Sequence, residues 1–214
     1  MVLYDYELSA DCYAVRLLAA LLRLDLALVP VAFYPAREHE GAAFRRINPK
    51  GSLPALVDGD MTLTETGAIL AHLAARGDAN GHWLPQERLA PVLEWLGFAA
   101  RLGASAGLAR LHDGFMLPAD IGQARREAEA CFRYLDAHLW FAEAAGQDWL
   151  CPGARPTIAD IACFPHVMLA EEGGIERIHY PAIRRWLDRV RSLPGFIGMP
   201  GIFVPAPVPA RAGG

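Results

Sequence analysis

The chain has 214 residues, of which 53% are hydrophobic and 21% are charged, with a formal net charge of −4. This length accommodates one large or two modest domains with a real hydrophobic core, and the apolar content excludes a disordered chain. The mild acidity argues against nucleic acid as the main partner, and no apolar run is long enough to span a bilayer.

The first third of the chain alternates predicted strands and helices. Its apolar runs predict four short strands, at residues 1–4, 28–33, 55–57 and 61–63. Apolar spacing predicts one helix from Ala14 to near Asp25 and another from Thr66. The turn signal at residues 58–60 joins the last two strands as a hairpin, and Pro30 suits an edge strand. The order β-α-β-β-β-α requires a parallel first pair and adds antiparallel strands.

The composition shifts to turn residues at 77–81, where we place a domain boundary. We expect one domain at residues 1–77, an all-helical domain at 86–193 and an irregular, Pro- and Gly-rich tail at 194–214. Three amphipathic faces support the helical domain, at residues 92–102, 128–139 and 183–190. Thr157 and Asp160 have the spacing of a capping box before an apolar run, which we interpret as structural.

The four cysteines are far apart and form no C-x-x-C pair; they are Cys12, Cys131, Cys151 and Cys163. No signal peptide precedes the first strand. We therefore expect a reduced, cytoplasmic protein without disulfides. The seven histidines do not combine with cysteines or carboxylates at metal-ligand spacing, so we expect no metal site.

Ser9 stands where the first strand hands over to a helix. The amino end of a helix offers free N–H groups and a positive partial charge, both of which favour an anion. The turn resembles that of the thioredoxin fold, but it reads S-x-x-C up to Cys12, which excludes a dithiol–disulfide cycle within the motif. Two roles follow for Ser9: a helix N-cap, or a hydroxyl that donates to a bound thiolate.

The second informative block is Asn48-Pro49-Lys50-Gly51-Ser52-Leu53-Pro54, followed by Glu65-Thr66. It resembles the glutathione-binding signature of cytosolic glutathione transferases. The resemblance implies a thioredoxin-like N-terminal α/β domain followed by an all-α domain. It also implies that Leu53 pairs through its backbone with the cysteinyl part of glutathione, before a cis Pro54. Glu65 and Thr66 match the pair that holds the γ-glutamyl group.

Two further residues are implied at the other end of the tripeptide. His39, between Glu38 and Glu40, resembles the theta-class histidine that reaches the glycyl carboxylate. Lys50 competes for the same role. On its own, a histidine in a polar stretch is just as consistent with an ordinary surface residue.

The turn around Ser9 also resembles theta, delta and zeta enzymes, in which the serine stabilises the glutathione thiolate. Asp11 and Tyr13 depart from the theta and delta pattern, which leaves the class open. Asp11 would oppose thiolate formation if its charge faced the thiol, and it stands near the place of the beta-class catalytic cysteine. We expect Cys12 to be a small core residue.

The resemblance implies an enzyme that conjugates glutathione to small hydrophobic electrophiles, in a homodimer, with Ser9 as the thiolate-stabilising residue. Two alternatives stay open. One is a glutathione-dependent isomerase, dehalogenase or lyase that uses the same site with a different second substrate. The other is a binding module that keeps the fold without catalysis.

Overall fold

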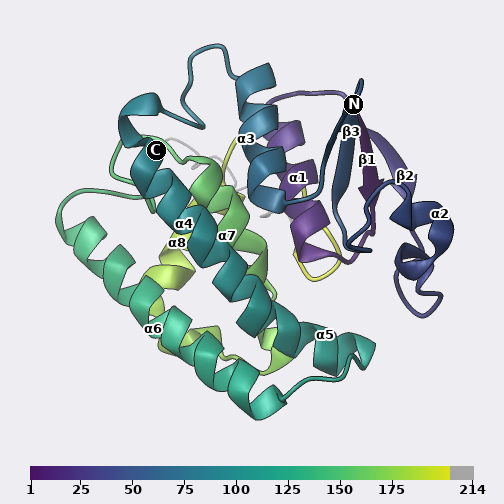
Figure 1. Ribbon diagram of the computed structural model, residues 1–214. Helices are drawn as coiled ribbons and strands as arrows, with labels where there is room; N and C mark the ends of the chain where they lie inside the picture. The colour runs from purple at the N-terminus through teal and green to yellow at the C-terminus, as the bar shows by residue number, and fades with distance from the viewer. Residues whose placement is uncertain (203–214) are drawn as a thin grey trace, which may run out of the picture.

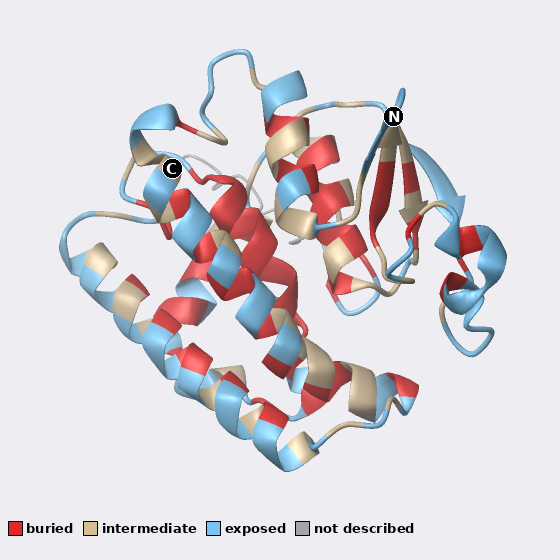
Figure 2. Cartoon of the chain, in the orientation of Figure 1, coloured by how far each residue is buried: buried red, intermediate tan, exposed pale blue. Residues whose placement is uncertain are grey.

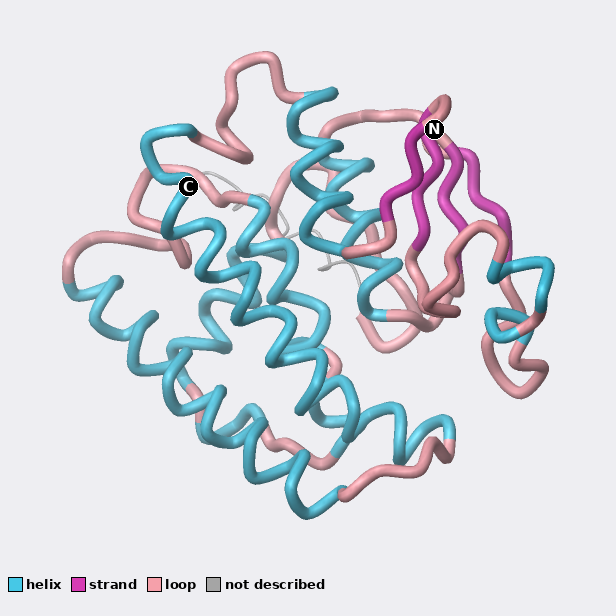
Figure 3. Tube along the Cα trace, in the orientation of Figure 1, coloured by secondary structure: helices cyan, strands magenta, loops and turns pink. Residues whose placement is uncertain are grey.

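A small sheet and a larger set of helices lie side by side in the computed structural model, which describes residues 1–202 (Figures 1 and 3). Residues 203–214, the greater part of the tail expected at 194–214, lie outside the described residues. Phe196 packs edge-on against Phe164 of the helical part, and Met199 and Ile202 are buried. The chain before residue 203 therefore stays packed on the core.

The sheet has four strands in the order β2-β1-β3-β4. They are β1 (Val2–Asp5), β2 (Ala27–Pro30), β3 (Ala55–Asp58) and β4 (Met61–Leu63). Strand β1 pairs in parallel with β2 and antiparallel with β3, and β3 pairs antiparallel with β4. Gly59, at φ +60°, closes the predicted hairpin, because glycine adopts the left-handed region without strain. Pro30 lies on an edge strand, as predicted, but it ends β2 three residues earlier than expected.

Helices cover both faces of the sheet. Helices α1 (Ala10–Leu21) and α3 (Thr66–Gly77) share one core cluster with Leu3 and Leu56 of the sheet. The short α2 (Ala42–Arg45) lies on the other side (Figure 1), where Phe44 packs with Val31 and Ala55. The sheet is thus a layer between two sets of helices.

The first helix differs from its prediction at both ends. It begins at Ala10, four residues before the start that apolar spacing gives, because the Ser9 side chain accepts a hydrogen bond from the Cys12 N–H and caps it. It ends at Leu21, and Arg23 then takes a left-handed conformation with φ +56°. Asp25 therefore lies beyond the helix.

The remaining described chain is helical. Its long helices are α4 (Leu89–Leu102), α5 (Leu108–Phe115), α6 (Ile121–Ala144), α7 (Ile158–Met168) and α8 (Pro181–Arg191). A π-helical turn, η3 (Gly103–Gly107), joins α4 to α5. Helix α7 is buried over nearly its whole length and runs through the centre of the molecule (Figure 2). No helix of residues 1–202 is both long and apolar enough to cross a bilayer.

The predicted capping box begins α7. The Thr157 hydroxyl accepts from the Ala159 N–H at 3.3 Å, and Asp160 Oδ2 accepts from the Thr157 N–H at 2.9 Å. The other carboxylate oxygen of Asp160 accepts from Trp186 Nε1 at 2.9 Å and from the Leu150 N–H at 3.1 Å. The box is structural, as predicted, and it also ties α7 to α8.

Candidate functional site

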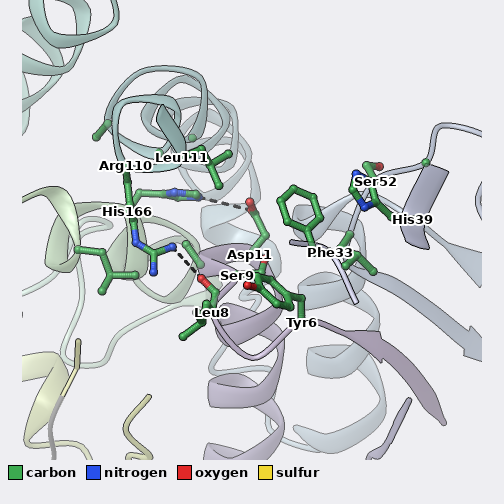
Figure 4. A pocket seen from close by; sticks show the side chains of 17 residues that line it. Tyr6, Leu8, Ser9, Asp11, Phe33, His39, Ser52, Arg110, Leu111 and His166 are labelled. Carbon is green, nitrogen blue, oxygen red and sulfur yellow. Dashed lines mark hydrogen bonds and ion pairs between the residues drawn. The ribbon is translucent and has the colours of Figure 1, made fainter. Parts of the chain in front are cut away.

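A cleft of about 210 Å³ opens between the sheet-containing part and the helices (Figure 4). Its N-terminal wall comes from the loop after β1, the start of α1 and the segments before α2 and β3. Its helical wall comes from η3, α5, α7 and the residue after α7. The residues that line the cleft include Tyr6, Ser9, Asp11, Phe33, His39, Leu53, Arg110 and His166.

Ser9 lies on the N-terminal wall at the positive end of α1. Its Oγ accepts from the Cys12 N–H at 3.2 Å, so the N-cap interpretation is correct. The hydroxyl also has one proton, for which the Cys12 thiol, hydrogen-bonded to the Ser9 side chain, competes with an acceptor in the cleft. Capping uses only a lone pair, so capping and donation to an anion are compatible roles for one side chain.

Cys12 lies beside Ser9, and its thiol is hydrogen-bonded to the Ser9 side chain. The Cys12 side chain is fully buried, and burial raises the pKa of its thiol to about 12. A thiol with that pKa supplies almost no thiolate near neutral pH. Cys12 is a core residue, as expected, and all four cysteines are free and buried.

The segment from Asn48 to Pro54 is built by local hydrogen bonds. Buried Asn48 donates from Nδ2 to the Ser52 carbonyl at 2.7 Å and accepts from the Lys50 N–H at 3.1 Å. Gly51 adopts φ +63°, and a Cβ at this position would lie only 3.0 Å from the His39 carbonyl oxygen, which is tighter than an ordinary contact. The Leu53–Pro54 peptide is cis, as expected. Leu53 lines the cleft, and Pro54 is buried behind it.

His39 also lines the cleft, and it is buried rather than a surface residue. Its ring stacks on Phe33 with centroids 4.2 Å apart. Burial lowers the pKa of His39, although Glu40 opposes that shift. Its Nδ1 is buried and has no hydrogen-bond partner among the described residues, and its Nε2 lies 3.6 Å from Glu40 Oε1.

Lys50, Glu65 and Thr66 are not among the residues that line the cleft. Lys50 Nζ pairs with the Glu65 carboxylate and also donates to Thr64 Oγ1 at 3.1 Å. The Lys50 and Glu65 side chains are 54% and 72% exposed. A ligand ammonium that binds Glu65 must therefore compete with Lys50.

Thr66 Oγ1 donates to Asp11 Oδ1 at 2.9 Å. A hydroxyl has one proton, so in this arrangement Thr66 offers a ligand only lone pairs from its side chain. Its backbone N–H, in the first turn of α3, remains suited to a carboxylate. Thr66 does not line the cleft itself, but it is hydrogen-bonded to Asp11, which does.

Asp11 faces His166 across the cleft, with His166 Nε2 3.5 Å from Asp11 Oδ1 (Figure 4). Burial raises the pKa of Asp11, but the neighbouring His166 imidazole and the hydrogen bonds from His166 and Thr66 outweigh it. The net effect holds the pKa of Asp11 below its usual value. The Asp11 carboxylate, which departs from the theta and delta sequence pattern, is thus ionised and bound by two side chains.

Sequence reasoning missed the polar residues of the helical wall. Arg110, on α5, donates from Nη1 to the Leu8 carbonyl at 2.7 Å and from Nε to Glu172 at 2.6 Å. No local motif marks it. His166 did carry a signal, because it is the one basic residue in helix α7, whose other residues are apolar apart from Asp160. Such a residue in a buried helix calls for a partner or a role.

Within residues 1–202, no group of three or more histidine, cysteine or acidic side chains gathers where it could hold a metal ion. The ionisable side chains that line the cleft are Tyr6, Asp11, His39, Arg110 and His166. Aromatic and aliphatic side chains from both walls surround them, among them Phe33, Leu111 and Leu169. The geometry suits a polar peptide against one wall and an apolar group against the other.

Residues 1–75 match the family model described as glutathione S-transferase, N-terminal domain. A maleylacetoacetate isomerase from Pseudomonas aeruginosa is 30% identical over 203 residues, covering 92% of this chain and 93% of that protein. The theta-1 glutathione S-transferase of Mus musculus is 28% identical, covering 90% and 83% of the two chains. A solved glutathione S-transferase from Xanthobacter autotrophicus superimposes with a TM-score of 0.80 at 29% identity, covering 94% and 97%.

Proposed function

Because this chain belongs to the glutathione S-transferase superfamily, we propose that its cleft holds glutathione with the thiol at Ser9 and conjugates it to small hydrophobic electrophiles. The chain is a glutathione-dependent transferase in fold and family. The observation that carries the proposed mechanism is the Ser9 hydroxyl, which caps α1 and belongs to the lining of the cleft.

Each end of the tripeptide has candidate partners. For the cysteinyl part we propose the backbone of Leu53, which lines the cleft next to the cis Pro54. Glu65 and the backbone amide of Thr66 are the partners we propose for the γ-glutamyl group. For the glycyl carboxylate we propose His39, which lines the cleft, and Lys50, which would have to leave Glu65 to reach it. No metal enters this scheme.

The thiol must lose its proton near neutral pH for conjugation. Lowering a thiol pKa from about 8.5 costs about 1.4 kcal/mol per unit. One charge-assisted hydrogen bond and the positive end of a helix supply energies of this order. The apolar lining from Phe33, Leu111 and Leu169 favours a hydrophobic electrophile.

A second candidate is glutathione-dependent isomerisation of a maleyl compound by the same site. The observation that favours it is the 30% identity to the maleylacetoacetate isomerase over nearly the whole of both chains. A panel of halides, epoxides, peroxides and maleyl compounds, with product analysis, separates the two. Turnover of maleyl compounds without net glutathione consumption would replace conjugation as the main activity.

The same proposal covers the location, the role and the oligomeric state of the protein. We place it in the cytoplasm, since its four cysteines are free and buried. There it would detoxify electrophiles, and it would do so as a homodimer. Gel filtration with light scattering tests the dimer. A monomer at micromolar concentration contradicts that part of the proposal.

The decisive experiment is the thiolate absorbance of the glutathione complex against pH, in the wild type and Ser9→Ala. We expect the variant to keep its glutathione affinity but to raise the pKa of the bound thiol by about one unit or more. Turnover at neutral pH should fall about tenfold or more and recover partly in alkali. Ser192→Ala, which removes an exposed hydroxyl bonded to the Asp188 carbonyl, is the matched control. Superimposable curves for wild type and Ser9→Ala remove Ser9 from the mechanism.

A further inference from the structure

The turn that carries Ser9 is held from the helical domain on both sides. Arg110 Nη1 donates to the carbonyl of Leu8, immediately before Ser9, and His166 Nε2 faces the carboxylate of Asp11, two residues after it (Figure 4). The Arg110 and His166 side chains are 6% and 5% exposed. Both contacts cross from one domain to the other at the cleft.

A negative charge at Asp11 is a problem for a thiolate at Ser9. Like charges at short range disfavour each other, so an unshielded carboxylate would raise the pKa of the bound thiol. Asp11 follows Ser9 by two residues and lines the same cleft. The proposed mechanism therefore requires that hydrogen-bond donors other than Ser9 bind the Asp11 carboxylate.

Two donors from different elements approach the same oxygen of Asp11. Thr66 Oγ1, at the start of α3, lies 2.9 Å from Oδ1, and His166 Nε2, on α7, lies 3.5 Å from it. The other ionisable groups that line the cleft are Tyr6, His39 and Arg110. Arg110 is engaged by Leu8 and Glu172, which leaves His166 as the basic side chain paired with Asp11.

The His166 ring is seated so that Nε2 faces Asp11. A Cβ on Gly103 would lie 3.3 Å from its Cε1, and a Cβ on Gly107 would lie 3.1 Å from its Nδ1. The two glycines bound the π-helical turn η3 and leave room for the ring. Its Nδ1 is buried without a partner among the described residues. Nε2 is therefore the ring nitrogen placed to donate to Asp11.

We propose that His166 is a positioning residue of the thiolate site: with Thr66 it binds the Asp11 carboxylate and shields the thiolate at Ser9 from that charge. This inference rests on the proposed function. It makes the helical domain, and not only the Ser9 turn, responsible for the ionisation of glutathione. His166 acts through Asp11 and does not touch the thiol.

The test is a double-mutant cycle on the pKa of the bound glutathione thiol, read from thiolate absorbance. His166→Leu should raise that pKa by about one unit, because the Asp11 charge loses one of its two partners and keeps only Thr66. Asp11→Asn in the His166→Leu background should return it to within about 0.3 unit of the wild type. If His166→Leu raises the thiol pKa equally with Asp11 and with Asn at position 11, the proposal is overturned, because His166 would then act through shape alone.

A second variant keeps the proposal testable if His166→Leu does not fold. Asp11→Asn alone should lower the thiol pKa by no more than about 0.3 unit, because the charge is already shielded. A fall of a full unit means that the charge is unshielded, which contradicts the proposal. His166→Gln, which retains an N–H donor, should behave nearly as the wild type.

The controls separate this proposal from the function on which it rests. His138→Leu removes another partly buried histidine, whose Nε2 contacts the Leu150 carbonyl at 2.9 Å away from the cleft, and should leave the thiol pKa unchanged. The proposed function is contradicted if the wild type binds no glutathione. It is also contradicted if the curve of thiolate absorbance against pH is identical for the wild type and Ser9→Ala. A shifted Ser9→Ala curve beside an unshifted His166→Leu curve defeats only the role of His166.

Discussion

The two walls of the cleft are built from different kinds of structure. The N-terminal wall uses turns and a helix start, so that Ser9 and Leu53 present a small hydroxyl and a backbone segment to the cleft. The helical wall uses side chains within or just after packed helices, with Ala106, Leu111 and Leu169 beside Arg110 and His166. The N-terminal wall offers backbone and short polar groups together with Asp11 and His39, and the helical wall offers apolar side chains together with two basic ones.

This difference separates two tasks. Backbone groups at a turn can bind a peptide whose chemistry never changes, whatever is bound opposite it. Side chains on helices can vary in size without disturbing that turn, so the helical wall is suited to set the second substrate. His166 and Arg110 are the exceptions, because they reach back to the turn that carries Ser9.

The largest effect should follow from Glu65→Gln in the N-terminal half. Loss of a charge-assisted contact with the γ-glutamyl ammonium should weaken glutathione binding by about 1.5–3 kcal/mol, measured by titration calorimetry. A glutathione analogue without that ammonium should lose little more in the variant. Equal and independent losses would show that Glu65 does not contact the ammonium.

Glu176→Gln is the control for that variant. The Glu176 side chain is 74% exposed, close to the 72% of Glu65, but it pairs with His179 on the helical side. Its replacement removes a similar surface charge, so glutathione affinity should stay within about twofold of the wild type. A comparable loss in both variants would reduce the Glu65 effect to the net charge of the protein.

A smaller effect, of a different kind, is expected in the helical domain. Thr157→Ala removes the N-cap of α7 and should lower the free energy of unfolding by about 1 kcal/mol or more, measured in urea. Glutathione affinity per folded molecule should hardly change. Unchanged stability with a collapse of binding would contradict the structural role of the capping box.

Asp120→Ala provides the comparison for that loss. Asp120 also caps its helix, by accepting from the Gln123 N–H at 3.0 Å, but it is exposed and has no counterpart to the Asp160 network. Water can satisfy the freed amides there, so the loss should be smaller than for Thr157. The difference measures what burial adds to a helix cap.

The two walls also differ in how far the sequence predicts them. The hairpin, the edge proline and the Ser9 cap follow from local patterns, because turns and caps depend on residues close in the chain. His39 and Leu53 were expected only from the resemblance to glutathione transferases. The start of α1 that apolar spacing predicts is wrong, because the Ser9 cap and not the apolar repeat sets the first turn of the helix. Arg110 and His166 come from separate helices and meet the Ser9 turn only through tertiary packing, which no local pattern encodes.

The smallest effect should come from Lys50→Met, and it resolves the two roles open to this residue. Lys50 pairs with Glu65, and both side chains are more than half exposed, so the pair itself contributes about 1 kcal/mol or less. We expect glutathione binding to weaken about two- to fivefold, because a cation near the glycyl carboxylate is lost. The loss should shrink in high salt, since exposed charges are screened. A glutathione analogue amidated at the glycyl carboxylate should bind wild type and variant equally, and His39→Asn should remove the larger share of the affinity for that carboxylate. Tighter binding by Lys50→Met would mean that Lys50 competes with the γ-glutamyl ammonium for Glu65, which would assign the glycyl end to His39 alone.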